Sequence, residues 1–352
     1  MKIAKVQIKD FRGIDSLDLD FTGPDGKPLD LVVLAGPNGC GKTSVLEACL
    51  IAFGWPEDLG GRARAANNVR FGANDYKVRL TVIDNKGISH LLTGSKGKRT
   101  STIVGGVSPA PGTPPRPPMR FLGFQVPRPT PSPPTGPIEY FSSWRVSPFV
   151  GSLPVVVGKR DKKSRPPEDI RLRTIKEYLV NWTAMNAFRG EPDSASPQPK
   201  DEDVFSRINR AWKIFYPQHE DRFVAKLAKE ATEENIVFDV YLVDEKTRRE
   251  VPLDVLSSGE IEIFTMLGWS AIRDFAQGLL FVDEPELHLH PAWHRTILRA
   301  LRTVLPHTQI ICATHSPEIL DAVYSYERFT LLPFDDPRIL LANGAPEAET
   351  KT

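Results

Sequence analysis

The stretch from Leu31 to Ile51, LVVLAGPNGCGKTSVLEACLI, constrains the fold of this chain more than any other. It begins with four apolar residues, Leu31 to Leu34, as expected for a strand that is buried on both faces of a parallel sheet. A glycine-rich turn follows at once, and a helical pattern begins near Lys42. A buried strand, a tight turn and a helix in this order predict an α/β protein.

The turn GPNGCGKT has the composition of a phosphate-binding loop. Its glycines let the backbone turn tightly and point N–H groups inward, and the helix adds its positive end, so the turn forms an anion site. Lys42 is expected to reach the β- and γ-phosphates of a nucleotide, and the Thr43 hydroxyl to hold Mg²⁺. The residues expected to bind the nucleotide are Gly36, Asn38, Gly39, Gly41, Lys42, Thr43 and Ser44.

Two other interpretations of this turn stay open. A glycine-rich turn can lack a ligand altogether. A dinucleotide-binding fingerprint needs a third glycine where Ser44 stands, and it leaves Lys42 and Thr43 without a role. The buried strand before the turn and the amphipathic helix after it favour nucleotide binding over both.

Composition and charge narrow the class of protein. Of the 352 residues 45 are basic and 44 acidic, so the net charge of +1 does not require nucleic acid, and any such site has to be a local patch. No apolar run approaches the roughly 20 residues that span a bilayer, and the N-terminus alternates like a strand, so we expect a cytoplasmic protein without a membrane segment. The three cysteines show no paired spacing, which argues against disulfides or a zinc site.

Strands and helices are expected to alternate along the chain, which predicts a mostly parallel central sheet and an N-terminal antiparallel β subdomain. The predicted strands are 3–9, 17–21, 31–34, 76–84, 138–142, 236–243, 279–282 and 309–313, and residues 236–251 are expected to form a hairpin. Further helices are predicted at about 167–188, 202–216 and 291–304, and one begins at 256–260. Residues 105–137 contain twelve of the 32 prolines, which predicts an irregular insertion.

Three later motifs lie at the ends of predicted elements. LSSGE at 256–260 opens a helix, Asp283 and Glu284 follow an apolar strand, and His315 follows the next strand. Each motif alone has an ordinary interpretation, namely a helix cap, a solvated turn or a buried structural histidine. In this order after the phosphate loop, they resemble the ABC-type ATPases. DEPELHLHP at 283–291 resembles the OLD-like members of the SMC, RecF and OLD group in particular.

The resemblance implies ATP and Mg²⁺ as cofactors and a role for each of these residues. Lys42 would bind the phosphates, and Thr43 and Asp283 would hold Mg²⁺. Glu284 would orient and deprotonate the attacking water, and His315 would contact the γ-phosphate. The resemblance therefore implies an ATP hydrolase of the P-loop NTPase fold class, with the fold of an ABC-ATPase head.

The resemblance also implies that the site is shared. In the family, the residues that match Ser258 and Gly259 act on ATP held by another subunit, so the complete site forms when two heads sandwich the nucleotide. The family's lid glutamine has no clear match. Gln125 lies in the Pro-rich stretch, and Arg145 is the candidate for the equivalent place.

Four regions are expected: an N-terminal ATPase lobe at 1–157, a helical insertion or lid at 158–235, a C-terminal ATPase lobe at 236–335 and a tail at 336–352. A basic cluster between 159 and 173 offers a contact to DNA, and a solvated loop is the equal alternative. Residues 158–235 show no sustained heptads, unlike the long coiled coils of SMC proteins, and only the tail follows Leu332, where OLD nucleases carry a catalytic domain, so we expect an ATPase without its own effector. We therefore expect a compact ATPase that forms a homodimer or head-to-tail oligomer on ATP. It would control a separately encoded effector, a nuclease or another protein, in DNA repair or anti-phage defence. The alternative is a subunit that energises a membrane transporter.

Overall fold

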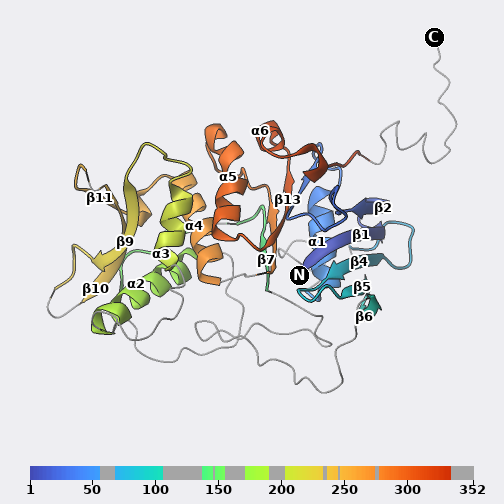
Figure 1. The fold of residues 1–352 in the computed structure, drawn as a ribbon, viewed down its shortest axis with the longest axis horizontal. Coiled ribbons are helices and arrows are strands. Elements are labelled where there is room, and N and C mark those ends of the chain that lie inside the picture. Colours follow the sequence, from blue (N-terminus) through green and yellow to red (C-terminus); the bar gives the residue numbers. More distant parts are fainter. Residues whose placement is uncertain are drawn as a thin grey trace, which may run out of the picture.

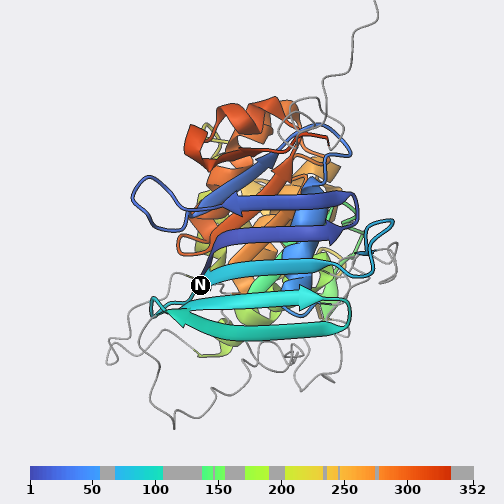
Figure 2. The same cartoon turned by 90° about the vertical axis from the view of Figure 1, so that its right-hand side faces the viewer.

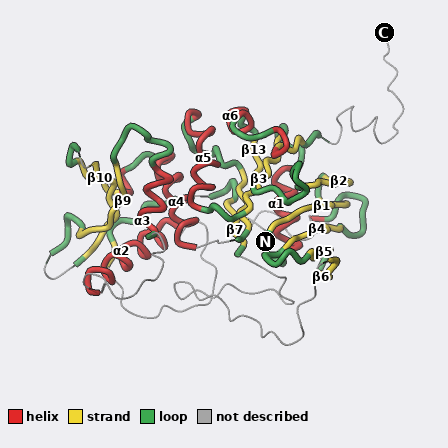
Figure 3. The backbone as a smooth tube through the Cα atoms, in the orientation of Figure 1, coloured by secondary structure: helices red, strands yellow, loops and turns green. Residues whose placement is uncertain are grey.

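The elements of the chain lie in layers along the long axis of the molecule (Figure 1). From one end to the other these layers are an antiparallel sheet, a group of helices, a central parallel sheet, one helix and a second antiparallel sheet (Figure 3). The predicted α/β fold with a parallel central sheet is confirmed. The computed structural model describes residues 1–55, 68–105, 137–145, 147–154, 171–189, 203–232, 236–244, 246–273 and 277–333.

The central sheet contains the strand that leads into the phosphate loop. Its strands all pair in parallel, in the order β14 (Arg328–Thr330), β3 (Leu31–Ala35), β13 (Gln309–Thr314), β12 (Leu279–Asp283) and β7 (Ile138–Phe141). Every residue of β3, β12 and β13 is buried, as their largely apolar sequences predict for strands covered on both faces. Alternate residues face opposite sides, so Leu31 and Val33 belong to one hydrophobic core, and Val32 and Leu34 to the other.

Helix α1 (Lys42–Ala52) covers one face of the central sheet and separates it from the N-terminal sheet. Figure 2 shows the five strands of that antiparallel sheet, in the order β2 (Ile14–Asp20), β1 (Lys2–Phe11), β4 (Lys77–Ile83), β5 (Ser89–Ser95) and β6 (Lys98–Gly105). The predicted antiparallel subdomain is confirmed, but β5 and β6 are additions to it. Their sequences, SHLLTGS and KRTSTIVG, are too polar to stand out as strands.

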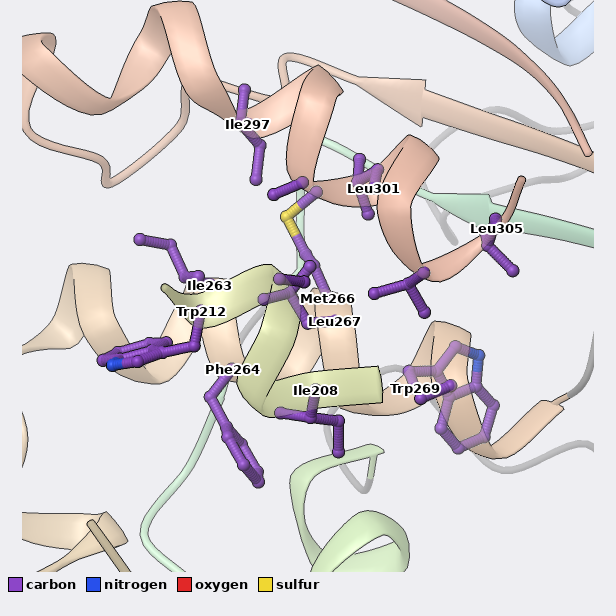
Figure 4. Packing of buried hydrophobic residues seen from close by; sticks show 14 of the residues in the cluster. Ile208, Trp212, Ile263, Phe264, Met266, Leu267, Trp269, Ile297, Leu301 and Leu305 are labelled. Atoms are coloured by element: carbon purple, nitrogen blue, oxygen red, sulfur yellow. The ribbon is translucent and has the colours of Figure 1, made fainter. Parts of the chain in front are cut away.

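A layer of helices covers the other face of the central sheet. It consists of α2 (Arg171–Arg189), α3 (Val204–Trp212), α4 (Ser258–Arg273) and α5 (Pro291–Val304), and the short α6 (Pro317–Asp321) packs on α5. Figure 4 shows how their apolar side chains interlock. Trp212 of α3, Phe264 and Leu267 of α4 and Leu301 of α5 are at most 1% exposed, so α4 is packed between its neighbours.

The outer sheet beyond these helices corrects part of the prediction. Its strand β10 (Val237–Asp244) forms the predicted hairpin with β11 (Arg249–Pro252) and also pairs with β8 (Leu153–Pro154) and β9 (Asp221–Leu227). The region 158–235 was expected to be helical, yet it contains β9. In the sequence DRFVAKL only Phe223 and Ala225 are buried, so the local pattern is weak and pairing with β10 decides the conformation.

Several expected features lie outside the described residues. These are the Pro-rich insertion 105–137 apart from its two end residues, Gln125 within it, the basic residues from Lys159 to Arg165, and the tail 336–352. None of the helices that the structure describes combines the length and the apolar character needed for a membrane span.

Candidate functional site

The phosphate loop follows β3, and its backbone takes conformations that suit glycine. Gly36, Gly39 and Gly41 have φ angles of +148°, +84° and +95°, a region that side chains disfavour. A Cβ atom on Gly36 would also lie 2.3 Å from the carbonyl oxygen of Leu331. No side chain caps the N-terminus of α1, which begins directly after Gly41. The positive end of the helix is therefore available to an anion in the loop.

Lys42 lies in the first turn of α1 and is 8% exposed. Its Nζ donates to the carbonyl oxygens of Gly36 and Pro37, at 2.8 and 2.9 Å. The ammonium group therefore lies against the loop that is expected to hold the phosphates. The sequence predicts that Lys42 binds the phosphates of a nucleotide from this position.

The next residue, Thr43, meets the end of β12. Its Oγ1 donates to the Asp283 carboxylate, with both Oδ atoms at 3.0 Å, although the two residues are 240 positions apart in the chain. Burial raises the pKa of Asp283, while hydrogen bonds from the Ser143 and Thr43 hydroxyls oppose that shift. A carboxylate with two hydroxyls is the hard oxygen set that Mg²⁺ prefers, so the residues fit this ion. Ser143, just after β7, is a candidate that sequence reasoning missed, since a lone serine carries no signal.

Arg145 does not take the place of the lid glutamine, and this expectation is corrected. The side chain is buried, and its Nη1 and Nη2 donate to the backbone carbonyls of Asp283 and Glu284, each at 2.7 Å. Its Nε forms an ion pair with Glu262 of α4. With these donors used on backbone and on Glu262, the guanidinium supports the turn after β12 and is not free to position water at Mg²⁺.

Replacing Arg145 by Met should therefore destabilise the fold. The change leaves the Glu262 carboxylate, 4% exposed, without its cation, so we expect the free energy of unfolding to fall by about 3 to 5 kcal/mol in urea denaturation. Arg295→Met is the matched control, because Arg295 is 62% exposed and its ion pair with Asp321 is 3.4 Å long. Equal stability of the two variants would show that Arg145 is not a support.

Glu284 and His315 lie next to each other at the carboxyl ends of β12 and β13. His315 Nδ1 is 3.6 Å from Glu284 Oε1 and 3.4 Å from Glu286 Oε1. Glu284 has a φ of +50° and donates its N–H to the Ala313 carbonyl at 2.8 Å. Such a conformation costs free energy in a residue other than glycine, and it is held here by the sheet and by Arg145.

Glu286 organises the loop that carries His315, a role that sequence reasoning missed. Its Oε1 accepts hydrogen bonds from the Thr314 hydroxyl at 2.6 Å and from the N–H groups of His315 and Ser316 at 3.0 and 3.2 Å. Because the carboxylate is 6% exposed, it serves the backbone of this loop and not solvent. Its place in DEPE, two residues after Glu284, was the available signal.

Ser258 and Gly259 begin α4 and lie apart from the phosphate loop of the same chain. Figure 1 shows α4 and α1 on opposite sides of the central sheet. Ser258 is exposed. Gly259 is buried, and a Cβ atom there would lie 2.8 Å from the carbonyl oxygen of His288. The structure thus brings Lys42 and Asp283 into one site but leaves this helix start outside it.

Part of the basic cluster is not available to DNA. Arg171 is 2% exposed, and its Nη2 donates to Glu139 Oε1 at 2.8 Å and to the Tyr140 carbonyl at 2.7 Å. Arg173 pairs with Glu177 one turn later, at 3.0 Å. A buried, paired guanidinium cannot reach a phosphate backbone, so the expectation of a DNA contact is corrected for Arg171.

Two family models match the chain. A model described as "AAA domain, putative AbiEii toxin, Type IV TA system" matches residues 157–321, and a model described as "AAA domain" matches residues 5–109. The two matches include the phosphate loop and the DEPE motif. The solved structure of an SMC head bound to the C-terminal winged-helix domain of ScpA superposes with a TM-score of 0.55 at 14% identity and covers 92% of each chain. This likeness shows the fold.

Curated relatives share shorter or weaker similarity. A Septu protein PtuA of Bacillus mycoides is 22% identical over 98% of this chain and 42% of its own length, and that of Bacillus thuringiensis is 38% identical over 18% and 16%. A "Retron Vc95 probable ATPase" of Vibrio cholerae is 46% identical over 14% of this chain and 9% of its own length. The chain therefore spans less than half the length of these relatives.

Proposed function

We propose that this chain is a compact ATPase of the SMC, RecF and OLD-like group and that two copies form a dimer with ATP bound between them. Formation of the dimer and hydrolysis of ATP would control a separate effector. One observation carries the proposal. The groups suited to phosphate, Mg²⁺ and water lie at one edge of the central sheet, whereas α4, which begins at Ser258, belongs to the helix layer on the face opposite α1. A second copy that supplies Ser258 would complete the site.

Each residue at this edge of the sheet has its own role in ATP hydrolysis. Lys42 binds phosphate oxygens, and Thr43 and Asp283 would hold Mg²⁺, which supplies charge neutralisation at the phosphates when bound. Glu284 accepts the proton of the attacking water. His315, 3.6 Å from Glu284 Oε1, donates a hydrogen bond to the γ-phosphate, so that its position depends on whether this group is present. Phosphoryl transfer needs positioning and charge more than covalent chemistry, which these groups provide.

The start of α4 offers what the γ-phosphate of a neighbouring copy requires. Ser258 is exposed and is the first residue of α4, so it stands at the positive end of the helix. Neither Ser258 nor this helix end is needed to bind ATP in one copy. A single chain would therefore bind ATP, and only the dimer would hydrolyse it.

The relatives support one of the biological roles considered for this chain. Two of them are Septu proteins and one is a retron ATPase, which favours control of a separately encoded effector in anti-phage defence over DNA repair and over transport. The effector is expected to be a nuclease or another enzyme that acts only in one nucleotide state. A contact to DNA through the basic residues between 159 and 165 is part of this proposal. Finding a nuclease or a permease as the binding partner would separate the defence role from transport.

A mixing experiment tests the shared site. Ser258→Arg should leave ATP binding intact and abolish both dimerisation and turnover, because a bulky cation blocks the closing surface. Lys42→Ala should abolish ATP binding. A head-to-tail dimer of the two variants keeps one intact site, so their mixture should hydrolyse ATP partially while neither variant does so alone, measured as phosphate release.

The matched control is Ser101→Arg, which makes the same change at an exposed position of β6, the edge strand of the N-terminal sheet. It should dimerise and turn over like the unmodified protein. If Ser258→Arg alone hydrolyses ATP at the normal rate at concentrations where only monomers exist, α4 is merely a capped helix and the shared site is wrong.

A further inference from the structure

The start of α4 is built around the carboxylate of Glu260. Glu260 Oε2 accepts hydrogen bonds from the N–H and the hydroxyl of Ser257, at 2.9 and 2.7 Å. In return, the Ser257 hydroxyl accepts the N–H of Glu260 at 3.4 Å. This reciprocal cap closes the first turn of the helix, which contains Ser258. The orientation of Ser258 therefore depends on where Glu260 is held.

Tyr216 holds the other oxygen of that carboxylate. Its hydroxyl donates to Glu260 Oε1 at 2.9 Å, across 44 residues of sequence. Burial, and then the hydrogen bond to Glu260, raise the pKa of Tyr216, so the phenol keeps its proton and acts as a donor. A hydrogen bond to a carboxylate is stronger than one between neutral groups, which makes it a firm tether.

Aromatic neighbours fix the ring of Tyr216. It stacks on Trp212, with ring centroids 5.0 Å apart and an angle of 30° between the planes, and it meets Trp293 edge to face at 5.6 Å. Trp293 also reaches α4, because a Cβ atom on Gly259 would lie 3.3 Å from its ring. Contacts of this kind restrict the ring to one position, so the hydroxyl presents itself to Glu260 without rearrangement.

The same group of residues includes the segment after Glu284. The ring centroids of Trp293 and His290 are 6.0 Å apart, and a Cβ atom on Gly259 would lie 2.8 Å from the carbonyl oxygen of His288. These contacts join the start of α4 to the segment that follows Glu284 in the same chain. The start of α4 would face ATP bound by a second copy, whereas Glu284 would act on ATP bound by its own chain. A shift of either part is resisted by the other.

We infer that Tyr216 is a positioning residue for the shared site: through Glu260 it holds the first turn of α4 in the orientation that presents Ser258 to ATP bound by a second copy. This inference rests on the proposed function. Because Tyr216 acts through Glu260, its loss is expected to act on the dimer and not on ATP binding by one chain.

Tyr216→Phe is the direct test, because it removes one hydroxyl and keeps the ring packing on Trp212 and Trp293. We expect ATP affinity of the monomer and the KM for ATP to stay unchanged, while kcat and the fraction of ATP-dependent dimer fall about tenfold, as for loss of a hydrogen bond to a charged group. Tyr326→Phe is the matched control, since Tyr326 is 44% exposed and stacks only on Tyr324 among the described rings. It should behave like the unmodified protein.

A second variant shows whether Tyr216 acts through Glu260. Glu260→Ala removes the acceptor and the cap, so it should lower kcat at least as much as Tyr216→Phe, and adding Tyr216→Phe to it should cause no further loss. Additive effects would overturn the inference. So would a fall in monomer ATP affinity in Tyr216→Phe, because the residue would then support the whole fold.

The outcome for the unmodified protein separates this inference from the proposed function. If the unmodified protein neither dimerises on ATP nor passes the mixing experiment, the proposed function is wrong and the inference falls with it. If it does both and Tyr216→Phe turns over ATP at the same rate and dimerises to the same extent, the proposed function stands and only the positioning role is wrong.

Discussion

Lys42→Ala should abolish ATP binding. The ammonium group lies against the phosphate loop, 2.8 Å from the Gly36 carbonyl oxygen, and among the described residues no other lysine follows that loop into α1. Its removal takes away the lysine of the phosphate loop, so that the backbone N–H donors, the helix end and Mg²⁺ are left to balance the charge of three phosphate groups. Calorimetric titration with ATP and Mg²⁺ measures the effect, and we expect no detectable heat of binding in the variant.

A matched variant shows that the loss is specific. Lys27 is an exposed lysine, 81% accessible and 4.0 Å from Asp25, at the turn before β3. Lys27→Ala removes the same charge from the molecule and should bind ATP normally. Unchanged ATP affinity in Lys42→Ala would mean that GPNGCGKT is a glycine-rich turn without a ligand. In that case the edge of the central sheet would not be an ATP-binding site.

Glu284→Gln should separate ATP binding from hydrolysis. The amide keeps the shape of the side chain but cannot accept the proton of the attacking water, so we expect turnover to fall by about 10² or more. ATP binding depends on Lys42 and the loop and should persist. In the presence of ATP and Mg²⁺ the variant should therefore accumulate as a dimer, which sedimentation or size-exclusion chromatography with light scattering detects.

The control for this prediction is Glu220→Gln, which neutralises an exposed carboxylate that pairs with Lys246 at 2.9 Å on the outer sheet. It should hydrolyse ATP at the normal rate. Turnover of Glu284→Gln equal to that of the unmodified protein would place the proton acceptor elsewhere. Glu286 is not an alternative of equal standing, because its Oε1 already accepts from the Thr314 hydroxyl and from two backbone N–H groups.

The residues of the candidate site differ in how far the sequence predicts them. The phosphate loop is a contiguous signal, because strand, turn and helix follow one another within 21 residues from Leu31 to Ile51. Asp283 and Glu284 are equally visible as acidic residues at the end of an apolar strand. The contact between Asp283 and Thr43 follows from parallel strands that place their carboxyl ends at one edge of the sheet. For these residues the local pattern was sufficient.

Residues that act through distant contacts carried no such signal. Arg145 could be read as a stand-in for the lid glutamine, because only the folded chain shows its guanidinium bound to the carbonyls of Asp283 and Glu284. The sequence pattern places Arg171 in a basic cluster, yet its side chain is buried and donates to Glu139, 32 residues earlier. Tyr216 lies 44 residues before Glu260, and no pattern in either segment points to the other.

The sequence by itself determined the parallel sheet, the phosphate loop and the polar residues at the strand ends, because apolar runs, glycines and helix starts are local and periodic signals. Only the tertiary structure decided the strands β5, β6 and β9, the support of the Glu284 turn by Arg145, and the tether from Tyr216 to the start of α4. Such contacts join residues that are far apart in the chain, and their free energy depends on burial that exists only after the layers have packed.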